Sequence, residues 1–136
     1  MTRLQTAFDA IDQANAADPN LDPQGRPEAL LYGQRMTDEQ QALYPDASEP
    51  LQIACRGQHI ERWTLPRHDF PMDRPGYLAW RTEQGRRHAA RVAEIMRAAG
   101  YGDADIQHAE KMLMKQGIKR DGDVQGRRRL ARAAFL

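Results

Sequence analysis

Apolar residues recur along this chain of 136 residues at intervals of three and four, the spacing of helices that bury one face. Leu4, Phe8 and Ile11 mark the first of these stripes. Alternation with a period of two, which would mark strands, is nearly absent. The pattern therefore predicts an all-α fold. The length fits one compact domain, and we expect about five or six helices.

Turn and capping residues set the expected limits of the next two helices. Pro27 suits the first turn of a second helix, because its missing N–H costs little there. That helix is expected to end at residues 44–46. Ser48 is a good N-cap for a third helix, which places Pro50 in the first turn.

The helical pattern is interrupted by prolines after the third helix. Three prolines between residues 63 and 75 exclude a continuous helix and, with their aromatic neighbours, predict an ordered Pro-rich loop. A long helix is expected over residues 75–99, closed by Gly100. Residues 103–116 predict another helix.

Composition narrows the setting of the protein. The chain is 40% hydrophobic and 29% charged, with a mean hydropathy of −0.80. No stretch approaches the roughly 18 apolar residues that a membrane span needs. The single cysteine, Cys55, excludes a disulfide framework and a cysteine-only zinc site. Residues 1–5 lack the apolar core of a secretory signal, so we expect a cytoplasmic protein with no membrane contact.

The charges are distributed unevenly. Residues 1–66 hold five arginines against ten acidic residues, whereas residues 67–136 hold fifteen basic and nine acidic residues. The basic half could bind an anionic partner such as nucleic acid, with its densest charge at Arg127, Arg128 and Arg129. Alternatively, the two halves form a solvated surface and attract each other.

Two histidines fall on inward-facing stripes. His59 continues the apolar stripe of the third helix, and His88 continues that of the long helix. A buried imidazole needs a partner. If the two helices are neighbours, both rings could meet one divalent metal ion or one anion. The alternative is that the two histidines are core residues, each hydrogen-bonded to a partner of its own. His68 falls in the loop, and His108 lies off the apolar face of its helix.

Arginine and aromatic residues are dense around the Pro-rich loop. Guanidinium groups bind phosphate or carboxylate bidentately and stack on aromatic rings, so the cluster suits a phosphorylated or nucleotide-like small molecule. The alternative is a stapled loop whose arginines pair with Glu61, Asp69, Asp73 and Glu83. The candidate ligand-binding residues are Gln58, Arg62, Trp63, Arg67, Arg74, Tyr77, Trp80 and Arg81, and the candidate metal ligands are His59 and His88.

Other signatures of catalysis are missing from the sequence. It contains no Gly-rich phosphate loop, no His-Glu-x-x-His and no Cys-x-x-Cys. Cys55 lies on an apolar face, where a thiol is usually inert packing. No carboxylate is assigned as a ligand or base, and the sequence leaves open whether the protein is an enzyme.

Three segments, residues 31–36, 56–63 and 66–81, resemble the domain-of-unknown-function 4202 family. The resemblance covers about residues 3–125. The family continues with an acidic helix, whereas residues 126–136 are basic here. The resemblance therefore implies one domain over residues 1–125 and a divergent or truncated C-terminal segment over 126–136.

A more distant similarity is to the HD superfamily of metal-dependent phosphohydrolases. It implies an HD-like arrangement of helices, with His59 near the end of the His-Asp doublet and His88 as an auxiliary histidine. Residues 32–34 contain no first histidine, and Ile60 follows His59 where the pattern has an aspartate. The similarity therefore supports an HD-like scaffold better than HD catalysis.

These features together predict a helical protein that binds a phosphate-bearing or other anionic small molecule between the third helix and the long helix. If the protein is an enzyme, we expect a metal-dependent phosphohydrolase-like reaction. The alternative is a non-catalytic RNA-binding or adaptor module that uses the basic C-terminal half.

Overall fold

The computed structural model describes residues 1–114, and within them it contains five α-helices, two short 3-10 helices and no strand. An isolated bridge pairs Leu21 with Pro27. The predicted all-α fold is confirmed. In chain order the elements are α1 (Arg3–Asn15), α2 (Glu28–Leu43), α3 (Glu49–Arg56), η1 (Arg62–Thr64), η2 (Arg67–Asp69), α4 (Arg74–Ala99) and α5 (Asp103–Met114).

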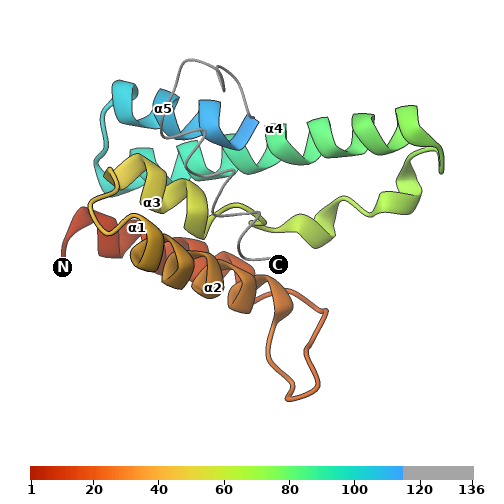
Figure 1. Ribbon diagram of the computed structural model, residues 1–136, viewed down its shortest axis with the longest axis horizontal. Helices are drawn as coiled ribbons and strands as arrows, with labels where there is room; N and C mark the ends of the chain where they lie inside the picture. Colours follow the sequence, from red (N-terminus) through yellow and green to blue (C-terminus); the bar gives the residue numbers. More distant parts are fainter. Residues whose placement is uncertain (115–136) are drawn as a thin grey trace.

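The long helix α4 runs along the whole molecule (Figure 1). It packs against α5 and α1, while α3 contacts α5, α2 and α1. The N-terminal half of α4 extends past the other helices, and the segment that carries η1 and η2 runs alongside this half (Figure 1). The two halves of α4 therefore have different surroundings.

The C-terminal half of α4 supplies the centre of the hydrophobic core. Val92 and Met96 are fully buried there and belong to one cluster with Ile11 of α1, Ile53 of α3 and Ile106 of α5. Burying one such side chain contributes about 1.5–3 kcal/mol. The apolar residues that recur at intervals of three and four in the sequence are those that form this core.

Local capping sets most helix ends where the sequence predicts them. The hydroxyl of Ser48 accepts a hydrogen bond from the Leu51 N–H, and Gly100 adopts a left-handed φ of 100° after α4. The helix α4 begins at Arg74 because the Asp73 carboxylate accepts a hydrogen bond from the Gly76 N–H.

The third helix is shorter than the sequence predicts. It ends at Arg56, so Gln58 and His59 lie in the turn that follows it rather than on the helix. Gly57 stands between α1 and α4. A Cβ at this position would lie 2.7 Å from Cγ2 of Val92, so glycine lets the chain approach α4 closely as it turns.

Parts of the sequence predictions fall beyond the described residues. The end of the last helix predicted over 103–116, and the basic segment 126–136 with its run of arginines, lie outside residues 1–114. Within the described residues, no helix combines the length and apolar character that a membrane crossing requires.

Tyr101 links the turn between α4 and α5 to the start of α3, and it makes the stability of the fold depend on pH. Its hydroxyl donates a hydrogen bond of 2.6 Å to Glu49 Oε1. Burial, and then this bond to a carboxylate, raise the pKa of Tyr101 above its ordinary value of 10.0. The bond stabilises the fold while the phenol keeps its proton, so this stability is present below about pH 10 and is lost as the pH rises further.

Tyr101→Phe should therefore lower the free energy of unfolding by about 1 kcal/mol at pH 8, with a smaller deficit at pH 11. Urea denaturation at the two pH values measures this. Tyr77→Phe, which alters an exposed tyrosine, is the control and should change neither value. A Tyr101→Phe deficit that is equal at both pH values would contradict the prediction.

Candidate functional site

The structure brings His59 and His88 together. Their ring centroids are 6.4 Å apart, with the ring planes inclined by 33°. His59 is half-buried in the turn after α3, and His88 is 6% exposed on α4. The side chains come from segments 29 residues apart in the chain, so tertiary packing creates the pair.

Tyr32 completes this cluster from a third element. Its ring stacks on the His59 ring with centroids 3.7 Å apart and planes within 7°. This stacking fixes the orientation of the His59 ring against α2. The sequence places Tyr32 on the apolar stripe of α2, which predicts that its ring is packed against other side chains. Nothing in the sequence indicates that the ring packs against a histidine.

The turn that carries His59 is held from two helices through Glu61. Glu61 has a φ of 52°, a left-handed conformation that non-glycine residues rarely adopt. Its N–H donates to Oδ1 of Asn15 at 2.9 Å, and its Oε1 accepts from Nε of Arg91 at 2.9 Å. Contacts from α1 and α4 therefore maintain a backbone conformation that would otherwise be unfavourable.

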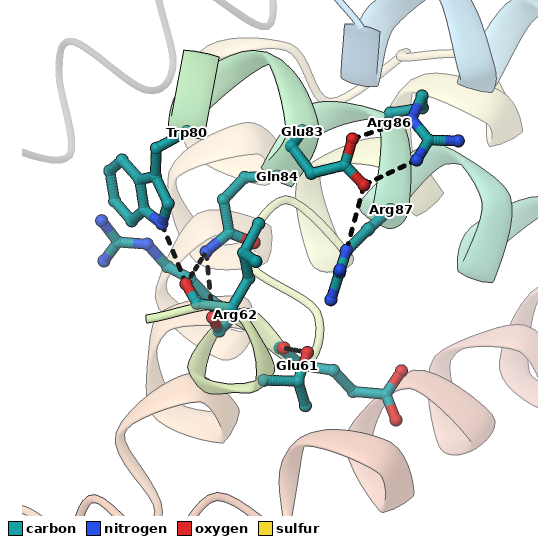
Figure 2. Close-up of polar contacts among 9 residues, drawn as sticks. Glu61, Arg62, Trp80, Glu83, Gln84, Arg86 and Arg87 are labelled. Atoms are coloured by element: carbon teal, nitrogen blue, oxygen red, sulfur yellow. Dashed lines mark hydrogen bonds and ion pairs between the residues drawn. The ribbon is translucent and has the colours of Figure 1, made fainter. Parts of the chain in front are cut away.

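A buried polar stripe on α4 holds the segment that follows. Gln84 Nε2 donates to the carbonyl oxygens of Arg62 at 2.9 Å and Leu65 at 3.2 Å. The indole N–H of Trp80 donates to the Leu65 carbonyl at 2.8 Å. Figure 2 shows the two side chains pointing from α4 toward this segment. His88 follows Gln84 one turn later on the same face.

Arg67 closes the Pro-rich loop on itself. Its Nη1 donates to the carbonyls of Phe70 at 3.3 Å and Pro71 at 2.9 Å, and its Nη2 donates to the carbonyl of Asp73 at 3.3 Å. Gly76 lets the loop end touch α4, since a Cβ there would stand 2.0 Å from the Pro71 oxygen. Arg67 is thus a structural residue of the loop as well as a surface cation.

The acidic residues expected to pair with the loop arginines have other partners. Glu61 binds Arg91, Asp73 caps α4, and Glu83 binds Arg86 and Arg87. Hydrogen bonds from these two arginines hold the pKa of Glu83 below its ordinary value. The candidate arginines around the loop make no ion pair with a carboxylate within residues 1–114. They are Arg62, Arg67, Arg74 and Arg81.

The candidate ligand-binding residues form two clusters rather than the single pocket that the sequence predicts. Gln58 adjoins the histidine pair in the chain and is half-buried, as is Trp63. Around Tyr77, the guanidinium carbons of Arg67 and Arg81 each lie 5.8 Å from the ring centroid.

Trp80 lies between these clusters along α4, 6.0 Å from Tyr77 and with Arg62 over its ring at 5.1 Å. Trp80 is buried and its N–H is bonded, so it packs the loop rather than walling a pocket. Eight residues separate Trp80 from His88, about 12 Å along a helix.

The histidine pair does not complete a metal site within the described residues. No group of three or more His, Cys, Asp or Glu side chains in residues 1–114 is arranged to hold a metal ion. Ile60, which stands where the HD pattern has an aspartate, is buried in the core. The described part of the chain thus offers two imidazoles and no third ligand.

An open groove of about 560 Å³ lies on another face of α4. None of the candidate site residues lines it, so the groove and the predicted chemistry do not coincide. Its walls are Leu65, Phe70, Leu78, Ala79, Thr82, Glu83 and Arg87.

The family model described as Domain of unknown function (DUF4202) matches residues 5–131 of the chain. The chain belongs to this family. The resemblance seen in the sequence is confirmed, while the HD-like arrangement stays a prediction. No curated protein and no solved structure matches the chain. The DUF4202 family is described as a domain of unknown function. A function for this chain is therefore inferred from the geometry of its own residues.

Asn15 should prove essential for holding the turn in this DUF4202 protein. Its side chain is 1% exposed and accepts the Glu61 N–H, so Asn15→Ala leaves a donor without its partner. We expect a loss of about 1–3 kcal/mol in the free energy of unfolding, measured by urea denaturation. Gln13→Ala, an exposed change on the same helix, is the control and should cost far less. Equal losses in the two variants would refute the role of Asn15.

Proposed function

We propose that this protein binds a phosphate-bearing small molecule through His59 and His88. The observation that carries the proposal is the placement of two imidazoles, from the turn after α3 and from α4, with ring centroids 6.4 Å apart. Imidazole N–H groups are good donors to phosphate oxygens, and a protonated ring adds charge to the bond.

The ring separation supports an anion better than a metal ion. Zinc–nitrogen bonds of about 2.1 Å in tetrahedral geometry place the centroids of two ligating imidazoles roughly 5 Å apart. Two N–H groups that donate to one oxygen at about 2.9 Å place them roughly 6.5 Å apart. The observed 6.4 Å is close to the second value.

Neighbouring residues support the same ligand chemistry. Stacking on Tyr32 fixes the orientation of the His59 ring. The Oε1 atom of Gln58 is buried and has no hydrogen-bond partner in residues 1–114, so a hydroxyl group of the ligand could donate to it. Arg62, which is exposed and without an ion pair in that range, supplies further positive charge from the same segment.

The proposal is for binding, with hydrolysis left unassigned. A divalent metal at His59 and His88 would need further ligands beyond those in residues 1–114, and it would supply Lewis-acid chemistry at the phosphate if they exist. Glu61, the carboxylate closest to His59 in the chain, is held by Arg91. We therefore assign no general base among the described residues.

Titration of the protein with inorganic phosphate and with pyrophosphate tests the proposal. The NMR signals of the histidine ring protons are recorded at each step of the titration. We expect saturable shifts for His59 and His88 and none for His68, whose side chain is 83% exposed. His59→Ala should weaken binding about tenfold or more, because a hydrogen bond to a charged group contributes about 1.5–3 kcal/mol. His68→Ala is the matched control and should bind as the wild type does.

Shifts of equal size at all histidines, or unchanged affinity in His59→Ala, would refute the anion site. A second comparison separates anion from metal. Phosphate binding should persist after dialysis against EDTA in protein prepared without a histidine tag. If EDTA abolishes binding and Zn²⁺ or Mn²⁺ restores it in the wild type but not in the His59→Ala, His88→Ala variant, the pair is a metal site instead.

A further inference from the structure

The N-terminal half of α4 exposes an aromatic ring among cations, away from the histidine pair. Tyr77 is 41% exposed and the neighbouring Leu78 is 46% exposed. Both lie near the start of α4. Figure 1 shows that this half of the helix extends past the other helices. The Tyr77 ring is therefore accessible to a ligand.

Three arginines surround Tyr77 without an ion pair, and one of them is held in place by the loop. Arg67 is fixed by three hydrogen bonds to loop carbonyls, which leave two of its five N–H groups for other acceptors. Arg81 follows Tyr77 by one helical turn and also lies over its ring, 5.8 Å from the centroid. Arg74 precedes Tyr77 by three residues. None of the three has a carboxylate partner in residues 1–114.

The nearby carboxylates offset only part of this charge. Asp73 accepts the Gly76 N–H at the start of α4, and Glu83 is bound by Arg86 and Arg87, which also exceed it in charge. Asp69 is half-exposed with His68 at 3.7 Å. The five arginines at positions 67, 74, 81, 86 and 87 outnumber these three carboxylates, so the surface around Tyr77 keeps a net positive charge. Of its cations, Arg67 is positioned before any ligand arrives.

We propose that Tyr77, with Arg67, Arg74 and Arg81, forms a binding surface for single-stranded nucleic acid. An unpaired base stacks on the exposed tyrosine, and the arginines bind the phosphates on either side of it. Exposed aromatic rings flanked by basic side chains are the usual means of binding single strands without sequence preference. An acidic peptide would use the arginines but has no need of the ring, so the ring favours nucleic acid.

This surface is independent of the histidine pair. Trp80 and Gln84 are buried on α4 between the histidine pair and Tyr77, and their N–H groups donate to loop carbonyls. They therefore belong to the framework that supports both sites. Nucleic-acid binding at Tyr77 would persist if His59 and His88 bound nothing.

Fluorescence anisotropy of the full chain with a labelled 12-nucleotide single-stranded RNA of mixed sequence, across a salt series, tests this surface. Tyr77→Ala should weaken binding about 5- to 100-fold, and Tyr77→Trp should restore it, since base stacking on an aromatic ring contributes about 1–3 kcal/mol. Arg81→Ala should reduce the slope of log K against log salt by about 0.7, the value for one phosphate contact with a single strand.

Arg97→Ala is the matched control. Arg97 is exposed at the other end of α4 and makes no ion pair in the described residues. The substitution Arg97→Ala therefore removes the same charge as Arg81→Ala, but far along the helix from Tyr77. It should leave the slope and affinity nearly unchanged, and His59→Ala should also bind RNA normally. Equal losses from Arg81→Ala and Arg97→Ala, or unchanged affinity in Tyr77→Ala, would overturn the proposal. So would displacement of the RNA by an equal concentration of a 12-residue poly-glutamate peptide.

Discussion

The hydrogen bonds from Gln84 and Trp80 to the Arg62 and Leu65 carbonyls determine where the rest of the site can lie. Two buried donors on α4 meet two backbone carbonyls, one at the start of η1 and one directly after it. Each unmet group would cost about 1–3 kcal/mol, so the segment after His59 has one favourable position along α4. That position sets the path of the chain between the histidine pair and the Tyr77 surface.

The helix α4 performs two tasks with one continuous stripe. Its buried positions are polar or aromatic at Trp80, Gln84 and His88 and become apolar from Val92 onward. The apolar half joins the core and supplies stability, whereas the polar half adds little net free energy and instead fixes geometry. A helix that was apolar throughout would bind the core more strongly but could not specify where the irregular segment attaches.

Periodicity and capping predict the helices because these signals are local in the sequence. Ser48 and Gly100 mark helix ends through their own conformational preferences, and His88 is recognised as inward-facing from its spacing. The end of α3 at Arg56 is missed because Gly57 matters through its approach to Val92, which belongs to another helix. Likewise, the sequence makes Trp80 a candidate ligand-binding residue. Its bond to the Leu65 carbonyl is a tertiary contact that no spacing reveals.

The two anion sites that we propose differ in how solvent affects them. The histidine pair is largely buried, with Tyr32 covering one ring, so water and salt screen its interactions weakly. The arginines around Tyr77 are exposed or nearly so, and salt at physiological strength screens charges beyond about 8 Å. A ligand at the histidines must therefore gain its affinity from a few well-placed hydrogen bonds. A ligand at Tyr77 must gain its affinity from several weak contacts along its length, which a small phosphate compound does not offer and a nucleic-acid strand does.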